Sequence, residues 1–213
     1  MHQISKALCF PPVSDASTEG LLAIGGDLSS ERIQLAYKSG IFPWFNPGEP
    51  ILWWAPKSRM VLYFDELVVS KSMRNILNRN TFTITFNQKF REVISNCSLI
   101  KREGQDGTWI SQEMIEAYCK LNELGIAKSV EVWQNDELVG GLYGIDLGDV
   151  FCGESMFSKV SNASKVAFVT LANKLKNENY KLLDCQVYNE HLDSLGCREI
   201  DRDEFMKLLN SGY

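Results

Sequence analysis

The chain has 213 residues, of which 45% are hydrophobic and 23% are charged, and its formal net charge is −5. This composition is typical of a globular protein with one or two domains and a sizeable core. No apolar run approaches the ~20 residues that cross a bilayer. The N-terminus also lacks the long apolar segment of a signal peptide. We therefore expect a cytoplasmic protein that does not contact a membrane.

Cysteine and histidine are too few and too scattered for most metal sites. The six cysteines include no C-x-x-C pair, and without an export signal we expect them to be free thiols. The chain contains only two histidines, His2 and His191. A histidine-rich zinc site is therefore excluded, and a Ser-His-Asp triad would have to use His191. We expect no metal ion.

Charge is unevenly distributed along the chain. Residues 57–102 carry nine basic and three acidic side chains, a net charge of +6, which leaves −11 for the rest. Such a segment is what a phosphate-binding surface on an acidic protein would contain. The ordinary alternative is the solvated face of a helix and a strand, and both interpretations fit the composition.

The first predicted elements lie in a segment rich in glycine and proline, residues 1–57. One short helix is predicted at about 30–39, with Ser29 or Ser30 as its N-cap. Four prolines between 43 and 56 predict irregular structure after this helix, yet the same stretch contains three of the five tryptophans. So many aromatic side chains must pack on the protein or bind a ligand. We predict a small N-terminal lobe that ends near residue 57.

From residue 58 the hydrophobic pattern becomes regular and predicts an α/β fold with a mixed sheet. It indicates strands at 59–64 and 81–87, a helix at 71–78, and a helix at 111–124 that ends at Gly125. Three β-runs within 128–155, divided by QND and LGD, predict an antiparallel meander. The chain is completed by a helix at 162–178, a strand at 181–186 that pairs in parallel, and two short helices.

The stretch LLDCQVYNEH, residues 182–191, places polar groups directly at the end of a buried strand. Burying an unpaired carboxylate costs several kcal/mol, so Asp184 needs a role there. Alternation along the strand predicts that Asp184 and Gln186 share one face while Cys185 packs on the other as a small hydrophobe. A carboxylate beside an amide at this end of a sheet suggests general-base or orienting work. The structural alternative is that Asp184 caps a helix at 188–195.

A second candidate is Glu154, which lies in the apolar stretch GESMFS at 153–158. Gly153 predicts a bulge or a close backbone approach beside it. One crossover helix joins this strand to the strand that carries Asp184, so the two carboxylates are expected to face one cleft, although an exposed glutamate at the rim is the ordinary alternative. That helix places Phe168, Leu171 and Leu175 at helical spacing. Such a face packs on the sheet and becomes a pocket wall only where a cleft opens.

Nine motifs in register carry a resemblance to a known family: GLLAIGGDLS, GIFPWF, PILWWAP, GTWI, SVEVW, LVGGLYG, VFCGESMFS, NASK and DCQ…H…SLG. From about residue 20 to 200 the chain resembles the leucyl/phenylalanyl-tRNA–protein transferases. The family implies a bacterial cytosolic enzyme that moves Leu or Phe from aminoacyl-tRNA to the N-terminal Arg or Lys of a protein, which is then degraded through the N-degron pathway. It also implies a GNAT-like catalytic domain over 58–213 beside an N-terminal lobe over 1–57 that contacts the 3′-adenosine. We expect a monomer without a cofactor.

The resemblance also implies roles for individual residues. Asp184 and Gln186 match the catalytic pair, in which the aspartate polarises the glutamine and the glutamine carbonyl accepts a proton from the attacking amine. A substrate-assisted reaction is the alternative. The positions that match the 3′-adenosine site are Tyr37, Trp44, Trp109 and Glu154, with Asn189 near the pair. The positions that match the pocket for the esterified side chain are Leu142, Met156, Phe168, Leu171, Leu175 and Leu183. A basic patch for the acceptor stem matches Lys71, Arg74 and Arg79.

The pocket departs from the family pattern at two positions. Leucines stand at 171 and 175 where aromatic residues are expected, which leaves the preference among Leu, Phe and Met open.

Two other functions are possible for this fold. An acetyl-CoA N-acetyltransferase would bind pyrophosphate at a glycine-rich turn that opens a helix, whereas the equivalent segment, FSKVSNASK at 157–165, contains no glycine. A non-catalytic tRNA-binding module would need neither an apolar pocket nor the pair formed by Asp184 and Gln186. Both alternatives are therefore weaker than the aminoacyltransferase.

Overall fold

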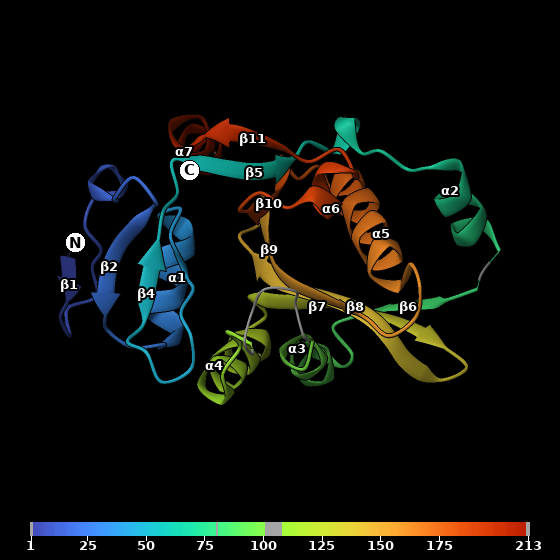
Figure 1. The fold of residues 1–213 in the computed structure, drawn as a ribbon, viewed down its shortest axis with the longest axis horizontal. Coiled ribbons are helices and arrows are strands. Elements are labelled where there is room, and N and C mark those ends of the chain that lie inside the picture. The colour runs from blue at the N-terminus through green and yellow to red at the C-terminus, as the bar shows by residue number, and fades with distance from the viewer. Residues whose placement is uncertain (1, 80, 101–107, 212–213) are drawn as a thin grey trace.

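The structure is a computed structural model that describes residues 2–79, 81–100 and 108–211. Within these ranges the strands form two sheets, and both are mixed (Figure 1). The smaller sheet has the strand order β1 (His2–Ile4), β2 (Leu21–Gly25), β4 (Leu52–Trp54), β3 (Phe42–Pro43). The larger sheet has the order β11 (Arg198–Asp201), β5 (Ser58–Leu62), β10 (Leu182–Gln186), β9 (Val150–Ser158), β8 (Glu137–Asp146), β7 (Ala127–Gln134), β6 (Thr83–Phe86). The α/β fold with a mixed sheet is confirmed.

The helices follow the predicted order, with one addition. They are α1 (Ser30–Lys38), α2 (Lys71–Asn78), α3 (Phe90–Ser98), α4 (Gln112–Glu123), α5 (Ala163–Asn177), α6 (Glu190–Asp193) and α7 (Arg202–Asn210). Single 3-10 turns occur at Val13–Asp15 and Phe64–Glu66. Helix α3 was not predicted, although its buried residues Phe90, Val93, Ile94 and Cys97 follow the helical period.

The smaller sheet is built around Trp53. Its indole is fully buried, and its Nε1–H donates to the carbonyl oxygen of Gly25 at 2.8 Å. The prediction of irregular structure after α1 was wrong at β3 and β4. Pro43 lies in β3, a strand of two residues at the edge of the sheet, where its missing N–H leaves no broken ladder bond. The division of the chain near residue 57 stays a prediction.

The larger sheet contains the predicted meander, β7-β8-β9, and the predicted parallel pairing of β10 with β9. Helix α5 covers one face of this sheet, and α3 and α4 cover the other (Figure 1). Gly140 in β8 allows this close packing, because a Cβ added there would lie 2.5 Å from the Cβ of Ala163 at the start of α5. Strand β11 was not predicted, since its four residues pair only with β5, which is far away in the sequence.

Two neighbouring strands carry bulges at adjacent positions, near the middle of β9 and near the end of β10. Against β8, Gly153 and Ser155 are paired and Glu154 between them is the extra residue. Against β5, Asp184 and Gln186 are paired and the extra residue is Cys185. The bulge expected beside Gly153 is therefore confirmed. A bulge re-aims the side chains around it, and these two bulges direct Glu154 and Gln186 toward one another.

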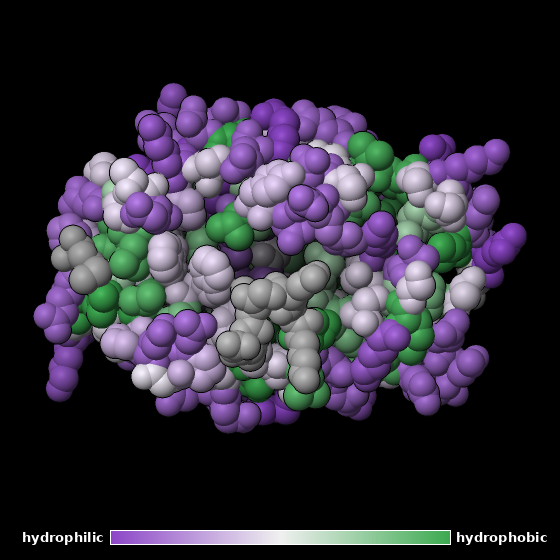
Figure 2. Space-filling view, in the orientation of Figure 1, coloured by the Kyte–Doolittle hydropathy of each residue, from purple (hydrophilic) through white to green (hydrophobic). Residues whose placement is uncertain are grey.

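The exterior is mainly hydrophilic on the face drawn in Figure 2, with hydrophobic residues in small separate groups. In the part of the chain that the structure describes, no helix is long and apolar enough to cross a membrane.

Candidate active site

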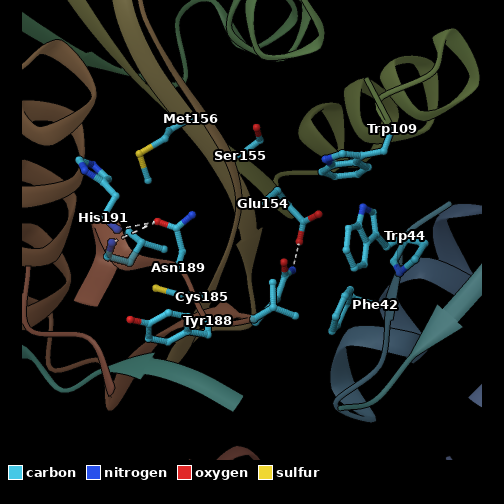
Figure 3. A pocket seen from close by; sticks show the side chains of 14 residues that line it. Phe42, Trp44, Trp109, Glu154, Ser155, Met156, Cys185, Tyr188, Asn189 and His191 are labelled. Carbon is cyan, nitrogen blue, oxygen red and sulfur yellow. Dashed lines mark hydrogen bonds between the residues drawn. The ribbon is translucent and has the colours of Figure 1, made fainter. Parts of the chain in front are cut away.

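A cavity of about 290 Å³ lies between the smaller sheet and the bulges of β9 and β10 (Figure 3). Phe42, Trp44 and Trp109 lie on one side of it, and Met156 and the residues around α6 lie on the other. The lining residues are Phe42, Pro43, Trp44, Trp109, Glu154, Ser155, Met156, Cys185, Gln186, Val187, Tyr188, Asn189, His191 and Leu192. The cavity thus has aromatic walls on one side and polar groups at its base.

Asp184 does not reach this cavity. Its side chain is fully buried, and its two oxygens accept from Nε and Nη2 of Arg59 at 2.8 and 2.7 Å. Oδ1 also accepts the backbone N–H of Gln186 at 2.9 Å. The aspartate therefore holds the backbone of Gln186 rather than its side-chain amide. The capping alternative is wrong, because Asn189 caps α6 by accepting from the N–H groups of His191 and Leu192.

The guanidinium of Arg59 makes contacts with other residues besides Asp184. Its guanidinium lies between the rings of Phe42 and Phe205, 4.8 and 4.5 Å from their centroids, and Nη1 donates to the carbonyl oxygen of Gly40 at 3.0 Å. Burial is the largest single influence and would lower the pKa of Arg59, but the charge and the hydrogen bonds of Asp184, with smaller contributions from Cys152 and Tyr37, together raise it. A buried pair of this kind is strongly destabilised when one partner is removed. It fastens β10 to β5, to α7 and to the segment before β3.

Glu154 lies at the centre of a polar network next to the cavity. One oxygen, Oε1, accepts from the hydroxyl of Tyr37 and from Nε2 of Gln186, both at 2.5 Å. The other oxygen, Oε2, lies 3.2 Å from the hydroxyl of Tyr118, and the two tyrosine hydroxyls are 2.6 Å apart. Burial raises the pKa of Glu154 to about 7, against the hydrogen bonds that lower it. Burial likewise raises the pKa values of both tyrosines well above their usual value.

Gln186 presents its amide to the cavity from an unusual backbone conformation. Its φ angle is +66°, in the left-handed region that a side chain of this kind rarely adopts. The residue lines the cavity while its Nε2–H is bound to Glu154. Strict alternation along the strand does not hold here, because the bulge lies between Asp184 and Gln186. Cys185 packs in the apolar cluster beneath α5 and also lines the cavity.

A smaller apolar cavity of about 80 Å³ continues from the larger one and shares Glu154, Ser155, Met156, Cys185 and Leu192 with it. Five of the six residues expected in the side-chain pocket line it: Leu142, Met156, Phe168, Leu171 and Leu183. Leu175 instead lines a separate hollow near Lys174 and Tyr180.

The residues expected at the adenosine site divide into two groups. Trp44 and Trp109 line the larger cavity, with Trp44 37% exposed and Trp109 9% exposed. Asn189 lines it too and is at the same time the N-cap of α6. Tyr37 is buried behind Glu154.

Sequence reasoning missed two residues that hold the site together, Arg59 and Tyr118. The sequence could have indicated Arg59, because it is a charged residue near the start of an otherwise apolar strand. Asp184 is a charged residue of opposite sign near the end of another such strand. Tyr118 lies on the buried face of α4 among apolar residues and has no signal that separates it from ordinary core.

The expected basic patch lies away from the cavity. Lys71, Arg74 and Arg79 are exposed on α2 and at its C-cap, at the opposite end of the molecule from the smaller sheet (Figure 1). Three of the other basic residues of 57–102 contribute less, because Arg59 is buried and Lys89 and Arg91 are paired with Glu92 and Glu116, whereas Lys57 is exposed. Two further members, Lys101 and Arg102, lie outside the described residues.

Metal ligands are not grouped anywhere in the described ranges. No three His, Cys, Asp or Glu side chains among those residues lie close enough together to hold a metal ion.

Known proteins match the chain over nearly its whole length. A family model described as leucyl/phenylalanyl-tRNA protein transferase matches residues 61–210, and a model of the N-terminal domain of that family matches residues 26–57. A leucyl/phenylalanyl-tRNA–protein transferase of Flavobacterium johnsoniae is 75% identical, over 99% of this chain and 100% of its own. One of Flavobacterium psychrophilum is 67% identical, over 98% of this chain and 99% of its own.

Among solved structures, the crystal structure of FemX matches 80% of this chain and 66% of that chain with a TM-score of 0.51. At 9% identity this is a likeness of fold alone. The likeness to the GNAT fold stays a prediction. Both the family models and the two Flavobacterium relatives agree on the enzyme class, and the chain therefore belongs to the leucyl/phenylalanyl-tRNA–protein transferase family of aminoacyltransferases.

Proposed function

We propose that this protein transfers Leu, and also Phe and Met, from aminoacyl-tRNA to the N-terminal Arg or Lys of acceptor proteins. In this proposal it acts as a cytoplasmic monomer without a cofactor, and the product is marked for degradation through the N-degron pathway. The observation that carries the proposal is the pair of adjoining cavities, one walled by tryptophans and one apolar. Glu154 lines both cavities, and Gln186, which is bound to Glu154, lines the larger one.

The two cavities suit the two parts of an aminoacyl-adenosine. Trp44 and Trp109 offer aromatic faces on which an adenine base stacks, an interaction worth about 1–3 kcal/mol per base. The esterified side chain then enters the small cavity next to Phe168 and Leu171. Its volume of about 80 Å³ is well below the ~150 Å³ of a cavity that holds benzene. We therefore propose that the pocket opens when a side chain enters it, and that it must open further for Phe than for Leu because the benzyl group is larger than the isobutyl group.

The chemistry is the aminolysis of an ester. The α-amine nitrogen of the acceptor bonds to the ester carbonyl carbon, the bond from that carbon to the 3′-oxygen breaks, and the proton lost by the amine passes to the 3′-oxygen. The ester is already activated, so positioning supplies much of the rate. Because its Nε2 end is bound to Glu154, Gln186 has its carbonyl oxygen available to accept a hydrogen bond from the attacking amine.

The exposed lysine and arginines of α2 are the proposed contact with the acceptor stem. They lie at one end of the molecule while the cavity lies beside the smaller sheet, so a bound tRNA would extend from the cavity toward α2 (Figure 1). Contacts of this kind make the affinity depend on salt.

One experiment tests the function directly. The protein is incubated with an Arg-initiated peptide and either Leu-tRNA or acetyl-CoA, and the peptide products are weighed. A mass increase by one leucyl residue supports the proposal. An acetyl increment would identify an acetyltransferase, and an unchanged peptide together with tRNA binding would identify a non-catalytic tRNA-binding module.

A further inference from the structure

The hydroxyls of Tyr37 and Tyr118 and the carboxyl group of Glu154 form a closed ring of contacts. Tyr37 lies 2.5 Å from Oε1 of Glu154, the two hydroxyls are 2.6 Å apart, and Tyr118 lies 3.2 Å from Oε2. Both tyrosines are buried, at 1% and 0% exposure. The two shorter contacts have the usual O–H···O distance and the third is a longer hydrogen bond, so hydrogen bonds in all three contacts require three protons.

A count of protons shows which form of Glu154 completes the ring. The two tyrosines supply one hydroxyl proton each, which fills two of the three contacts. An ionised Glu154 supplies none, so one contact would hold no proton. Either the two hydroxyl oxygens would face one another at 2.6 Å, or the hydroxyl oxygen of Tyr118 would face Oε2 at 3.2 Å. A protonated Glu154 donates from Oε2 to Tyr118, Tyr118 donates to Tyr37, and Tyr37 donates to Oε1. All three contacts are then hydrogen bonds.

The same arrangement leaves Oε1 as a carbonyl oxygen that accepts twice, from Tyr37 and from Nε2 of Gln186. Because Oε1 carries no proton, it can bind only the NH₂ end of the Gln186 amide. We propose that Glu154 is a neutral carboxylic acid that, held by Tyr37 and Tyr118, positions Gln186 with its amide oxygen toward the cavity. This inference rests on the proposed function, and it gives Asp184 a different task, the fixing of the Gln186 backbone.

The surroundings of Glu154 favour the neutral form. The charged or titratable groups that face it are Tyr37 on α1, Tyr118 on α4, Asp184 on β10 and Cys152 on β9. None of them is a cation, and Arg59, which lies behind Asp184, is neutralised by that residue. Burial raises the pKa of Glu154 to about 7, which agrees with the neutral form that completes all three hydrogen bonds.

Two substitutions at position 154 separate positioning from charge. Glu154→Ala removes the acceptor for Gln186, and misplacement of a reacting group by 1 Å can reduce the rate about 100-fold, so we expect a loss of that order in kcat with a smaller change in KM. Glu154→Gln places an amide NH₂ where the acid proton was and keeps the carbonyl oxygen. It should restore most of the kcat that Glu154→Ala loses. Glu131→Gln is the control, because Glu131 is a fully buried carboxylate on the neighbouring part of the sheet, bound to Thr85 and Ser129 away from the cavity, whereas Glu154 is partly buried.

Two measurements do not depend on activity. The infrared difference spectrum between wild type and Glu154→Gln should contain the C=O band of a protonated carboxyl group at about pH 6, and this band should disappear as the pH rises above about 7. The side-chain NH₂ resonances of Gln186, assigned by their loss in Gln186→Glu, should shift in Glu154→Ala and stay near their wild-type positions in Glu154→Gln.

The outcomes that overturn the proposal are distinct from failure of the proposed function. A Glu154→Gln variant as inactive as Glu154→Ala would show that the carboxylate charge itself is required. Absence of the acid band at about pH 6, or unmoved Gln186 resonances in Glu154→Ala, would each overturn the proposal too. If the wild type transfers no amino acid, the proposed function fails, while the infrared band and the amide resonances still decide how Glu154 and Gln186 are held.

Discussion

Replacement of Glu154 by Gln should change how the stability of the protein depends on pH. The pKa of this group rises from 4.5 in an exposed chain to about 7 in the fold, chiefly through burial. The folded state therefore holds a proton that the unfolded chain releases between these two values. Each unit of pKa shift corresponds to about 1.4 kcal/mol, so a shift of this size amounts to roughly 3 kcal/mol.

The sign follows from the direction of the shift. Because the folded pKa is the higher one, the stabilisation is fully present below 4.5 and is lost as the pH rises toward and through about 7. Wild type should therefore lose roughly 3 kcal/mol relative to Glu154→Gln between about pH 4 and pH 8.

Urea unfolding of both proteins across this range measures the effect, since every other titrating group is common to the two and cancels in the difference. A difference that does not change with pH would refute the reasoning, because it would mean that Glu154 has the same proton affinity in the folded and unfolded chain.

Three further predictions concern other parts of the site. Asp184→Ala should destabilise the fold by about 3–5 kcal/mol in urea unfolding, because it leaves the Arg59 charge buried and unpaired, and the idea fails if stability is unchanged. Leu171→Phe should narrow the small cavity and lower kcat/KM for Phe-tRNA more than for Leu-tRNA. If the ratio of the two kcat/KM values does not change, Leu171 belongs to the hydrophobic core and does not line the substrate pocket. Lys71, Arg74 and Arg79 should be replaced together by alanine. The slope of log affinity for tRNA against log salt concentration should then become less steep by about two to three units, and an unchanged slope would place the bound tRNA elsewhere.

Local pattern in the sequence was sufficient for most elements of the larger sheet. The meander, the crossover helix α5 and the parallel strand β10 were predictable because their hydrophobic periods are long and their turns carry clear signals. Helix α3 has the same kind of pattern at Phe90, Val93, Ile94 and Cys97, so the sequence also encodes this helix, although it was not predicted. The motifs likewise determined the family, which the relatives confirm.

Only the tertiary structure decided how the polar residues of the site are paired. Asp184 finds its partner in Arg59, 125 positions away in the chain, and Glu154 finds Tyr37 and Tyr118 on two separate helices. No local period encodes such contacts, because each forms only when distant elements pack together. Bulges are a second reason. The extra residues at 154 and 185 interrupt the alternation of side chains between the two faces of the sheet, so the bulges decide which side chains reach the cavity.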